Sequence, residues 1–318
     1  MIYSAIKGTG SYLPKRILTN QDLEQIVDTS DSWIRERTGI ECRHLAGEKD
    51  SCTSMAVAAA KDALNASSVK LDDVDLVIVA TATPDRAFPS VACHVQSALG
   101  IKKGAAFDVS AACSGFIYAL TLADNAIKAG SAKTALIIGS EMIPRYIDWT
   151  DRTTCILFSD GAGACILQAS DTPGIITTDL GSDGDYSELL YANHPSAYPS
   201  DKCFLQMKGN EVFKKAVNTL GSLVDNLVKK QGIATESIDW LIPHQANKRI
   251  IQATAKKLGL PMDKVIMTVA QHGNTSAASI PLALDWGIKQ GKVKPGQRLF
   301  LEAFGAGFTW GSALIDYH

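Results

Sequence analysis

Residues 74–78 read VDLVI, and residues 238–242 read IDWLI, which is a similar apolar run at an offset of 164 residues. Other short matches support this offset, or one of 159 residues, as a difference in loop length produces. They pair residues 119–120 with 283–284, residues 136–137 with 300–301, and residues 99–101 with 258–260. Hydrophobic strands can match by chance, but a long fixed period is typical of duplicated folds. If the repeat is real, the fold is a pseudo-twofold pair of halves, and a site is expected where they meet.

The runs around this repeat predict an α/β fold, because short β-branched stretches alternate with amphipathic helical patterns. The predicted strands are 76–80, 105–108, 134–141, 240–243 and 299–304, with further strand-like runs at 264–269 and 310–316. The predicted helices are 52–65, 91–99, 114–129, 212–230, 247–258 and 276–290. Each half then reads strand, helix, strand, long helix, strand.

The composition is that of an ordinary folded protein. Of the 318 residues, 46% are hydrophobic and 20% are charged, which is too apolar for disorder. The net charge of -2 gives no general case for nucleic-acid binding. A chain of this length is expected to form two domains or one large fold with two similar halves.

The cysteines and short motifs exclude several classes of function. The seven cysteines form no CxxC pair, which argues against zinc ribbons and thioredoxin-type sites, and their odd number indicates a reducing, cytoplasmic compartment. We find no signal-peptide pattern and no run of 18 apolar residues. Walker, HExxH and GxSxG motifs are absent, so nucleotide-loop, zincin and serine-hydrolase functions have no support.

Cys113 is the first candidate for chemistry. It follows a short apolar run and opens the predicted helix 114–129. Unpaired N–H groups and the positive end of the helix dipole favour a thiolate at such a position, and the thiolate is the nucleophilic form. The alternative is a buried structural cysteine, which is the usual fate of a free cysteine.

Two polar residues in the second half have a similar placement. His244 follows the predicted strand 240–243, and Asn274 follows the strand-like run 264–269, where α/β folds place their sites. His244 could instead be a structural histidine, and Asn274 a turn residue after a glycine. His272 is a weaker rival, because it does not directly follow a strand. Near the C-terminus, small residues at 305–307 could let backbone N–H groups hold an oxyanion, although a plain turn is the alternative.

Taken together, these segments resemble one known family. AACSGF around Cys113, PHQAN around His244, HGNTSAAS around Asn274 and the C-terminal FGAGFTWGSAL are similar to the β-ketoacyl-acyl-carrier-protein synthases III of the thiolase superfamily. The resemblance covers the whole chain. It implies a five-layered αβαβα thiolase-like fold of two duplicated halves, 1–170 with the nucleophile and 171–318 with the histidine and asparagine. It also implies a homodimer.

The resemblance assigns a catalytic triad to Cys113, His244 and Asn274. The backbone N–H groups of Cys113 and Ala306 would form the oxyanion hole. This chain departs from the family there, because the family usually reads GGG where residues 305–307 read GAG. The donor at Ala306 is expected only if its backbone angles suit alanine.

The resemblance also assigns binding residues. The coenzyme A site would comprise Trp33, Arg37, Arg152, Gly209 and Asn247, with Trp33 and Arg152 flanking the adenine. The acyl-carrier-protein site would comprise Gln245, Ala246, Asn247, Lys248 and Arg249. The acyl pocket would comprise Phe88, Met142, Phe158, Leu189, Leu205 and Phe213, with Phe88 reaching across the dimer.

The activity implied is a decarboxylative condensation that initiates fatty-acid synthesis. A short acyl-CoA, most simply acetyl-CoA, acylates Cys113, and malonyl-acyl carrier protein then gives the 3-ketoacyl product, CO₂ and CoA. No metal or other cofactor is expected. Three alternatives stay open at this stage: a specialised condensing enzyme that makes a quinolone, polyketide or head-to-head product, a Cys-His-Asn hydrolase, and a non-catalytic acyl-binding protein.

Overall fold

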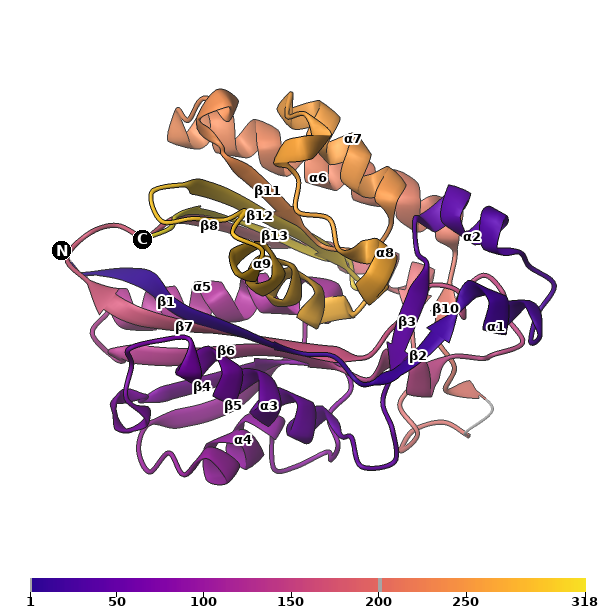
Figure 1. Cartoon of the computed structure of the whole chain (residues 1–318), viewed down its shortest axis with the longest axis horizontal. Helices are drawn as coiled ribbons and strands as arrows, with labels where there is room; N and C mark the ends of the chain where they lie inside the picture. The colour runs from indigo at the N-terminus through magenta and orange to yellow at the C-terminus, as the bar shows by residue number, and fades with distance from the viewer. Residues whose placement is uncertain (1, 200–201) are drawn as a thin grey trace.

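The computed structural model describes residues 2–199 and 202–318, which form two sheets that carry the two halves of the sequence repeat (Figure 1). The strands of the first sheet lie in the order β1 (Tyr3–Tyr12), β7 (Gly161–Ser170), β6 (Thr134–Glu141), β4 (Leu76–Ala80) and β5 (Ala105–Val109). Those of the second lie in the order β11 (Trp240–Pro243), β12 (Arg298–Gly305), β13 (Thr309–Asp316) and β8 (Ile175–Ser182).

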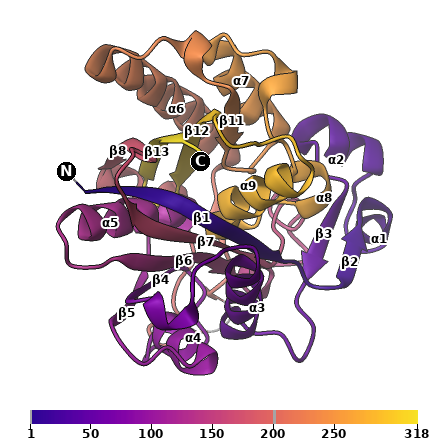
Figure 2. The ribbon, with the colours of Figure 1, turned by 60° about the vertical axis from the view of Figure 1, so that its left-hand side comes forward.

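Helices cover both sheets and fill the space between them, which gives five layers (Figure 2). The outer layer on the first sheet is α3 (Cys52–Asn65) and α4 (Val91–Leu99), and the outer layer on the second is α6 (Gly209–Gln231) and α7 (Lys248–Leu258). The central layer is α5 (Gly115–Lys128) and α9 (Ser279–Lys289), which contact both sheets. The predicted αβαβα fold is confirmed.

Equivalent hydrogen bonds recur within each of the two halves. In the first, the N–H of Asp75 donates to the carbonyl of Thr134 at 3.0 Å, and the N–H of Thr134 donates back to the Asp75 carboxylate at 3.0 Å. In the second, Asp239 and Arg298 make the same pair of contacts at 2.9 and 2.8 Å. Both residues of the second pair stand 164 positions after their counterparts, so the sequence repeat is structural and not a chance match.

The repeat extends to a strained turn before each central helix. Short 3₁₀ turns at Ala112–Ser114 and Ser276–Ala278 precede α5 and α9. Ala112 has φ +44° and Ser276 has φ +50°, and these are the non-glycine residues with positive φ in the described chain. Positive φ is uncommon for residues with a Cβ. The same rare conformation therefore recurs at the same offset of 164.

The predicted strand at 264–269 is wrong. This run forms only a parallel bridge, between Leu241 and Val265. The bridge corresponds to the pairing of Val77 with Ala106 in the first half. The chain then turns into the short helix α8 (Val269–His272). The Gln245 side chain accepts the N–H groups of Thr268 and Val269, so it satisfies donors that a strand would have paired with a neighbour.

The sequence patterns did not predict β1, β7 or β8. Glycines interrupt the apolar alternation of β1 and β7 because helices pack very close to these strands. A Cβ added at Gly10 would lie 2.2 Å from the backbone nitrogen of Ala63 in α3, and one at Gly163 would lie 2.6 Å from that of Leu282 in α9.

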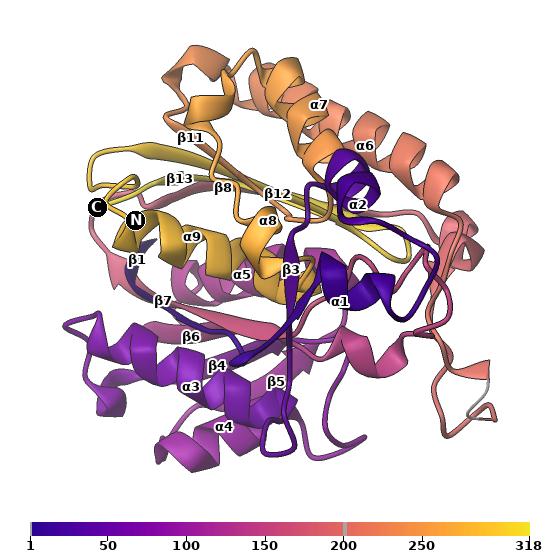
Figure 3. The same cartoon turned by 45° about the vertical axis from the view of Figure 1, so that its right-hand side comes forward.

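A segment of two short strands and two helices, which was also not predicted, precedes α3. It comprises β2 (Arg16–Thr19), α1 (Asn20–Glu24), α2 (Asp31–Thr38) and β3 (Cys42–Leu45), and it brings α2 beside α7 of the second half (Figure 3). The short strands β9 (Leu190–Tyr191) and β10 (Gln206–Met207) pair with each other. No helix in the described ranges is long and apolar enough to cross a membrane.

Candidate active site

Cys113 lies in the strained turn between β5 and α5, where the C-terminal loop covers it. The backbone at Gly305 approaches so closely that an added Cβ would lie 2.7 Å from the Cys113 nitrogen. The Oγ1 of Thr309 donates to the carbonyl of Ala111 at 3.0 Å and accepts from the Oγ of Ser114 at 2.6 Å. The end of the second half is thus fastened to the turn that carries the candidate nucleophile.

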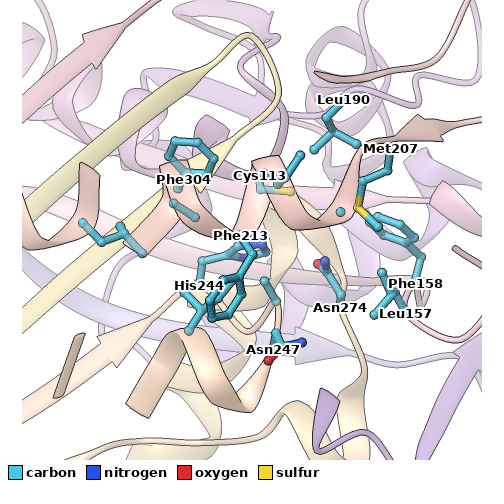
Figure 4. A pocket seen from close by; sticks show the side chains of 16 residues that line it. Cys113, Leu157, Phe158, Leu190, Met207, Phe213, His244, Asn247, Asn274 and Phe304 are labelled. Carbon is cyan, nitrogen blue, oxygen red and sulfur yellow. The ribbon is translucent and has the colours of Figure 1, made fainter. Parts of the chain in front are cut away.

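Two cavities meet at Cys113. The first, of about 130 Å³, is lined by Cys113, His244 and Asn274 together with apolar side chains (Figure 4). The second, of about 250 Å³, shares Cys113, Phe158 and Leu190 with the first and is also lined by residues that include Thr83 and Ser276. The structure therefore brings the three triad candidates to one cavity wall, at the junction of the two halves.

His244 is fixed by its neighbours at the end of β11. Its backbone N–H donates to the carbonyl of Glu302 at 2.8 Å, and its Nδ1 lies 2.6 Å from the Oγ of Ser279. That Oγ also accepts the N–H of Gln245, so its own proton is available to Nδ1; when it donates there, the ring carries its proton on Nε2. Burial lowers the pKa of His244 to about 4, so the imidazole is neutral at pH 7.

Asn274 is oriented by the turn that follows it. Its Oδ1 accepts the backbone N–H of Ser276 at 2.9 Å, which leaves the donor end of the amide to face other groups. The Asn274 N–H donates to the carbonyl of Leu157, and Asn274 forms a parallel bridge with Phe158. A neutral imidazole and an amide with its donor end available suit an incoming carbonyl oxygen.

Burial opposes the expected ionisation of Cys113 at rest. Burial raises the pKa of the Cys113 thiol to about 12, and this effect outweighs the lowering that the nearby Ser276 side chain causes. The short 3₁₀ turn separates Cys113 from the start of α5, so the regular helix begins only at Gly115. Cys113 is thus a thiol in this state, and its attack requires a group that takes the proton.

Ala306 is the residue to which the resemblance assigns the second oxyanion donor. It lines the second cavity beside Cys113, and it is absent from the described residues with positive φ, so alanine is compatible with its backbone conformation. Its carbonyl accepts from Thr309 Oγ1 at 3.0 Å. The departure from the family pattern at this position therefore causes no steric conflict.

The coenzyme A candidates lie in two groups. On the outside, the guanidinium carbons of Arg37 and Arg152 lie 4.6 and 5.1 Å from the ring centroid of Trp33. Farther in, Gly209 and Asn247 line the first cavity. The Asn247 side chain donates to the carbonyl of Arg37 at 3.0 Å, which links the two groups.

The carrier-protein candidates divide into exposed and buried residues. Lys248 and Arg249 are exposed at the start of α7, and Ala246 and Asn247 line the first cavity. Gln245 is the exception, because it is fully buried. Its amide bonds the carbonyls of Pro243 and Ile266 as well as the α8 backbone, so its side chain holds the loop and does not face a partner.

The residues assigned to the acyl pocket do not all line one cavity. Phe158 lines both cavities, Leu205 lines the second, and Phe213 lines the first. Met142 is buried in the core under α3, and Leu189 packs beside Phe304 and Phe308. Phe88 is 84% exposed and lines neither cavity.

Several residues of the second cavity were missed. They are Thr83, Ile143, Tyr146, Leu190 and His194. Thr83 follows β4, and Ile143 and Tyr146 follow β6, so the carboxyl ends of these parallel strands could have pointed to them. In the described ranges, no group of three or more His, Cys, Asp or Glu residues is placed to hold a metal ion.

A duplicated five-layered fold with Cys, His and Asn around one cavity defines the class of thiolase-like condensing enzymes. Family models agree: that for 3-oxoacyl-[acyl-carrier-protein] synthase III matches residues 107–184, and that for its C-terminal part matches residues 228–317. The β-ketoacyl-[acyl-carrier-protein] synthase III of Thioalkalivibrio sulfidiphilus is 55% identical, with all of both chains covered.

Solved structures give the same result. The 3-oxoacyl-[acyl-carrier-protein] synthase III of Aquifex aeolicus has a TM-score of 0.94 and 48% identity, and the match covers 99% of this chain and all of that one. The priming β-ketosynthase of the R1128 polyketide pathway has a TM-score of 0.95 and 34% identity, covering 99% and 96% of the two chains.

The chain belongs to the 3-oxoacyl-[acyl-carrier-protein] synthase III family. It is an acyl-transferring enzyme whose condensation initiates fatty-acid synthesis. The duplicated fold removes the hydrolase alternative, because such hydrolases lack this duplication. Family membership over the full length equally disfavours a non-catalytic acyl-binding protein.

Proposed function

We propose that the enzyme transfers a short acyl group, with acetyl as the main substrate, from CoA to Cys113 and condenses it with malonyl-acyl carrier protein. The products would be 3-ketoacyl-acyl carrier protein, CO₂ and CoA. The position of Cys113 between two cavities carries this proposal. One cavity leads to the coenzyme A candidates, and the other offers room for an acyl group beyond the thioester carbon.

In the first half-reaction, Sγ of Cys113 attacks the acyl-CoA thioester. The backbone N–H groups of Cys113 and Ala306 would stabilise the negative charge on the tetrahedral oxygen. The Cys113 nitrogen lies next to Gly305, so the two donors are neighbours across the contact between β12 and the nucleophile turn. CoA leaves, and an acyl thioester on Cys113 remains.

In the second half-reaction, His244 and Asn274 donate hydrogen bonds to the thioester carbonyl of malonyl-acyl carrier protein. Both side chains are held by other contacts, His244 at Nδ1 and Asn274 at Oδ1, so little reorganisation is needed. Loss of CO₂ leaves an enolate whose carbon attacks acyl-Cys113. A single chain would thus carry out acyl transfer, decarboxylation and condensation without a metal or a redox cofactor.

Binding of coenzyme A would begin at Trp33. The indole already stacks with the guanidinium groups of Arg37 and Arg152, and opening that arrangement would let a purine lie against the Trp33 ring. Arg37 would then lie near the phosphates. The narrow part of coenzyme A that carries the thioester would pass Asn247 and Gly209 to reach Cys113.

Carrier-protein docking would take place at the start of α7. Acyl carrier proteins are acidic, so a basic face suits them. Lys248 and Arg249 are exposed there, and Arg249 lies over the Phe213 ring, with 5.2 Å between the guanidinium carbon and the ring centroid. This stacking places a positive charge at the rim of the first cavity.

The functional unit would be a homodimer. β5 is an edge strand of the first sheet, and its Phe107 is 39% exposed. Phe88 projects with 84% of its surface exposed, which is costly for a phenyl ring in water. Pairing through this face would cover both residues and let Phe88 close the acyl pocket of the partner. We place the enzyme in the cytoplasm, since all seven cysteines are free.

The test is incubation with a panel of acyl-CoAs, followed by intact-mass measurement. An acetyl adduct on Cys113 supports the proposal, and turnover of that adduct with malonyl-acyl carrier protein completes it. A specialised condensing enzyme would instead prefer longer or unusual acyl groups. The absence of any adduct at Cys113 would reject the proposal.

A further inference from the structure

Cys113 needs a proton acceptor, and the triad does not supply a good one. The thiol is protonated at neutral pH because burial raises its pKa to about 12. His244 is a weak base there, since burial lowers its pKa to about 4 and Ser279 holds its Nδ1. Asn274 does not titrate. The acceptor must therefore lie elsewhere around the sulfur.

Ser276 is placed to receive this proton. Its turn packs against the turn that carries Cys113, both residues line the second cavity, and the Ser276 side chain is among the groups that lower the pKa of the thiol. The backbone of Ser276 has a positive φ of +50°, and its N–H donates to the Oδ1 of Asn274. A hydroxyl can accept one proton and donate another, so it can pass charge onward.

The onward contact is Glu141, at the end of β6. The Oγ of Ser276 donates to Oε1 of Glu141 at 3.0 Å. The other oxygen, Oε2, accepts from the Thr83 hydroxyl at 2.7 Å and from the Ala82 N–H at 3.1 Å. These donors stabilise a carboxylate that is completely buried, although burial still raises its pKa to about 7.

No positively charged group in the described chain is among the causes of the raised pKa of Glu141. The titratable groups that face Glu141 are the thiols of Cys113 and Cys52 and the phenol of Tyr146. Burial raises the pKa of each of them, so all three are neutral at pH 7. Glu141 is thus the acidic group in this cluster that changes charge near neutrality.

We propose that Ser276 and Glu141 form a proton relay that takes the proton of Cys113 during acyl transfer and returns it during condensation, which rests on the proposed function. As Sγ bonds to the thioester carbon, its proton passes to Ser276 Oγ, and the hydroxyl proton of Ser276 passes to Glu141. The C–S bond to CoA breaks, and the CoA thiolate takes a proton from solvent.

The relay runs backward in the second half-reaction. The enolate carbon bonds to the acyl carbon, the bond from that carbon to Sγ breaks, and the Cys113 thiolate recovers the proton from Glu141 through Ser276. Glu141 therefore stores one proton for the lifetime of the acyl-enzyme. Ser276 touches the reacting sulfur, and Glu141 acts through Ser276.

The test is the pH profile of Cys113 alkylation by iodoacetamide. Because the chain has seven cysteines, peptide mass spectrometry measures the alkylation of Cys113 separately. We expect the wild-type rate to rise through a pH of about 7. Glu141→Gln keeps an acceptor for Ser276 but cannot take the proton. It should lose this inflection and slow alkylation at pH 7.5 by on the order of a hundredfold, the scale of general-base catalysis.

Two further variants complete the design. Ser276→Ala removes the connecting hydroxyl and should have the same effect, which also decides the matter if Glu141→Gln does not fold. Glu302→Gln is the matched control: Glu302 is an equally buried carboxyl, with a pKa raised to about 8, but it borders Thr254 and not Cys113. It should keep the wild-type profile.

Decarboxylation of a malonyl thioester gives a second readout, because it needs no thiolate. The relay variants should retain it. A wild-type alkylation profile in Glu141→Gln, its loss only in His244→Ala, or an equal loss of alkylation and decarboxylation in the relay variants would each overturn the relay. Alkylation requires neither acyl-CoA nor carrier protein, so its result is independent of whether the proposed function holds.

Discussion

The Nδ1 atom of His244 lies 2.6 Å from the Oγ of Ser279, and this contact joins the end of β11 to the first turn of α9. It restrains the plane of the imidazole, and donation from the Ser279 hydroxyl to Nδ1 places the ring proton on Nε2. A histidine that must donate through Nε2 depends on such a partner, since the free ring exchanges between two tautomers.

We therefore predict that Ser279→Ala slows decarboxylation of malonyl-acyl carrier protein by on the order of tenfold, the equivalent of one hydrogen bond of about 1 kcal/mol. Acylation of Cys113 should change much less, because that step does not use His244. Separate assays of ¹⁴CO₂ release and of the Cys113 adduct check this. An equal loss in both assays would show a general structural defect instead.

The triad variants should separate the two half-reactions. Cys113→Ala loses acyl transfer but keeps decarboxylation, since it retains the His244 and Asn274 donors. His244→Ala and Asn274→Ala still form the acyl-enzyme but lose decarboxylation by about a hundredfold or more, as expected for removal of one donor to a developing oxyanion. Normal condensation by any of these variants would contradict the assigned roles.

Reversal of charge at Arg249 should act on the carrier substrate alone. Arg249→Glu is expected to raise KM for malonyl-acyl carrier protein at least several-fold, because the partner is acidic, and to leave KM for acetyl-CoA nearly unchanged. Lys70→Glu is a suitable control: Lys70 is exposed before β4, at the opposite ends of the strands from the site. Equal effects on both substrates would argue against docking at α7.

Buried carboxyls should make the enzyme less stable as the pH rises. Burial raises the pKa of Glu302 to about 8, so the folded state holds a proton that the unfolded chain releases above its ordinary pKa of 4.5. The resulting stability is complete below that pH and is lost up to about pH 8, at about 1.4 kcal/mol for each pH unit between the folded and unfolded pKa values.

The melting temperature should accordingly fall between pH 5 and pH 8.5, and Glu302→Gln should make this decline shallower. Thermal unfolding measured across this range checks the prediction. If the two proteins give parallel curves, Glu302 does not ionise on unfolding in the way its burial implies.

The fold was predictable to the extent that its signals were local. The offset of 164 residues connects β4 with β11 and β6 with β12, and these strands are continuous apolar runs. β1 and β7 were not predictable, because Gly10 and Gly163 follow from the close approach of helices that are distant in sequence. A sequence pattern does not reveal the neighbour that requires a glycine.

The same contrast holds at the candidate site. Cys113, His244 and Asn274 follow strands or open helices, and their positions alone indicated them. Phe213 and Met142 were assigned to the acyl pocket as apolar residues, but the direction in which each element presents them decides which space they line. Glu141 gave no signal, because it ends a strand of continuous apolar character and acquires its neighbours only on folding.

The two strained turns at Ala112 and Ser276 show a division of labour between copies of one ancestral loop. Counting 164 residues from Cys113 leads to Ala277, and counting from Ser110 leads to Asn274. The first turn carries the thiol of Cys113, and the second presents the Asn274 amide and the Ser276 hydroxyl to the first. The two turns therefore depend on each other. Neither could take the sequence of the other without removing a group that the shared site uses.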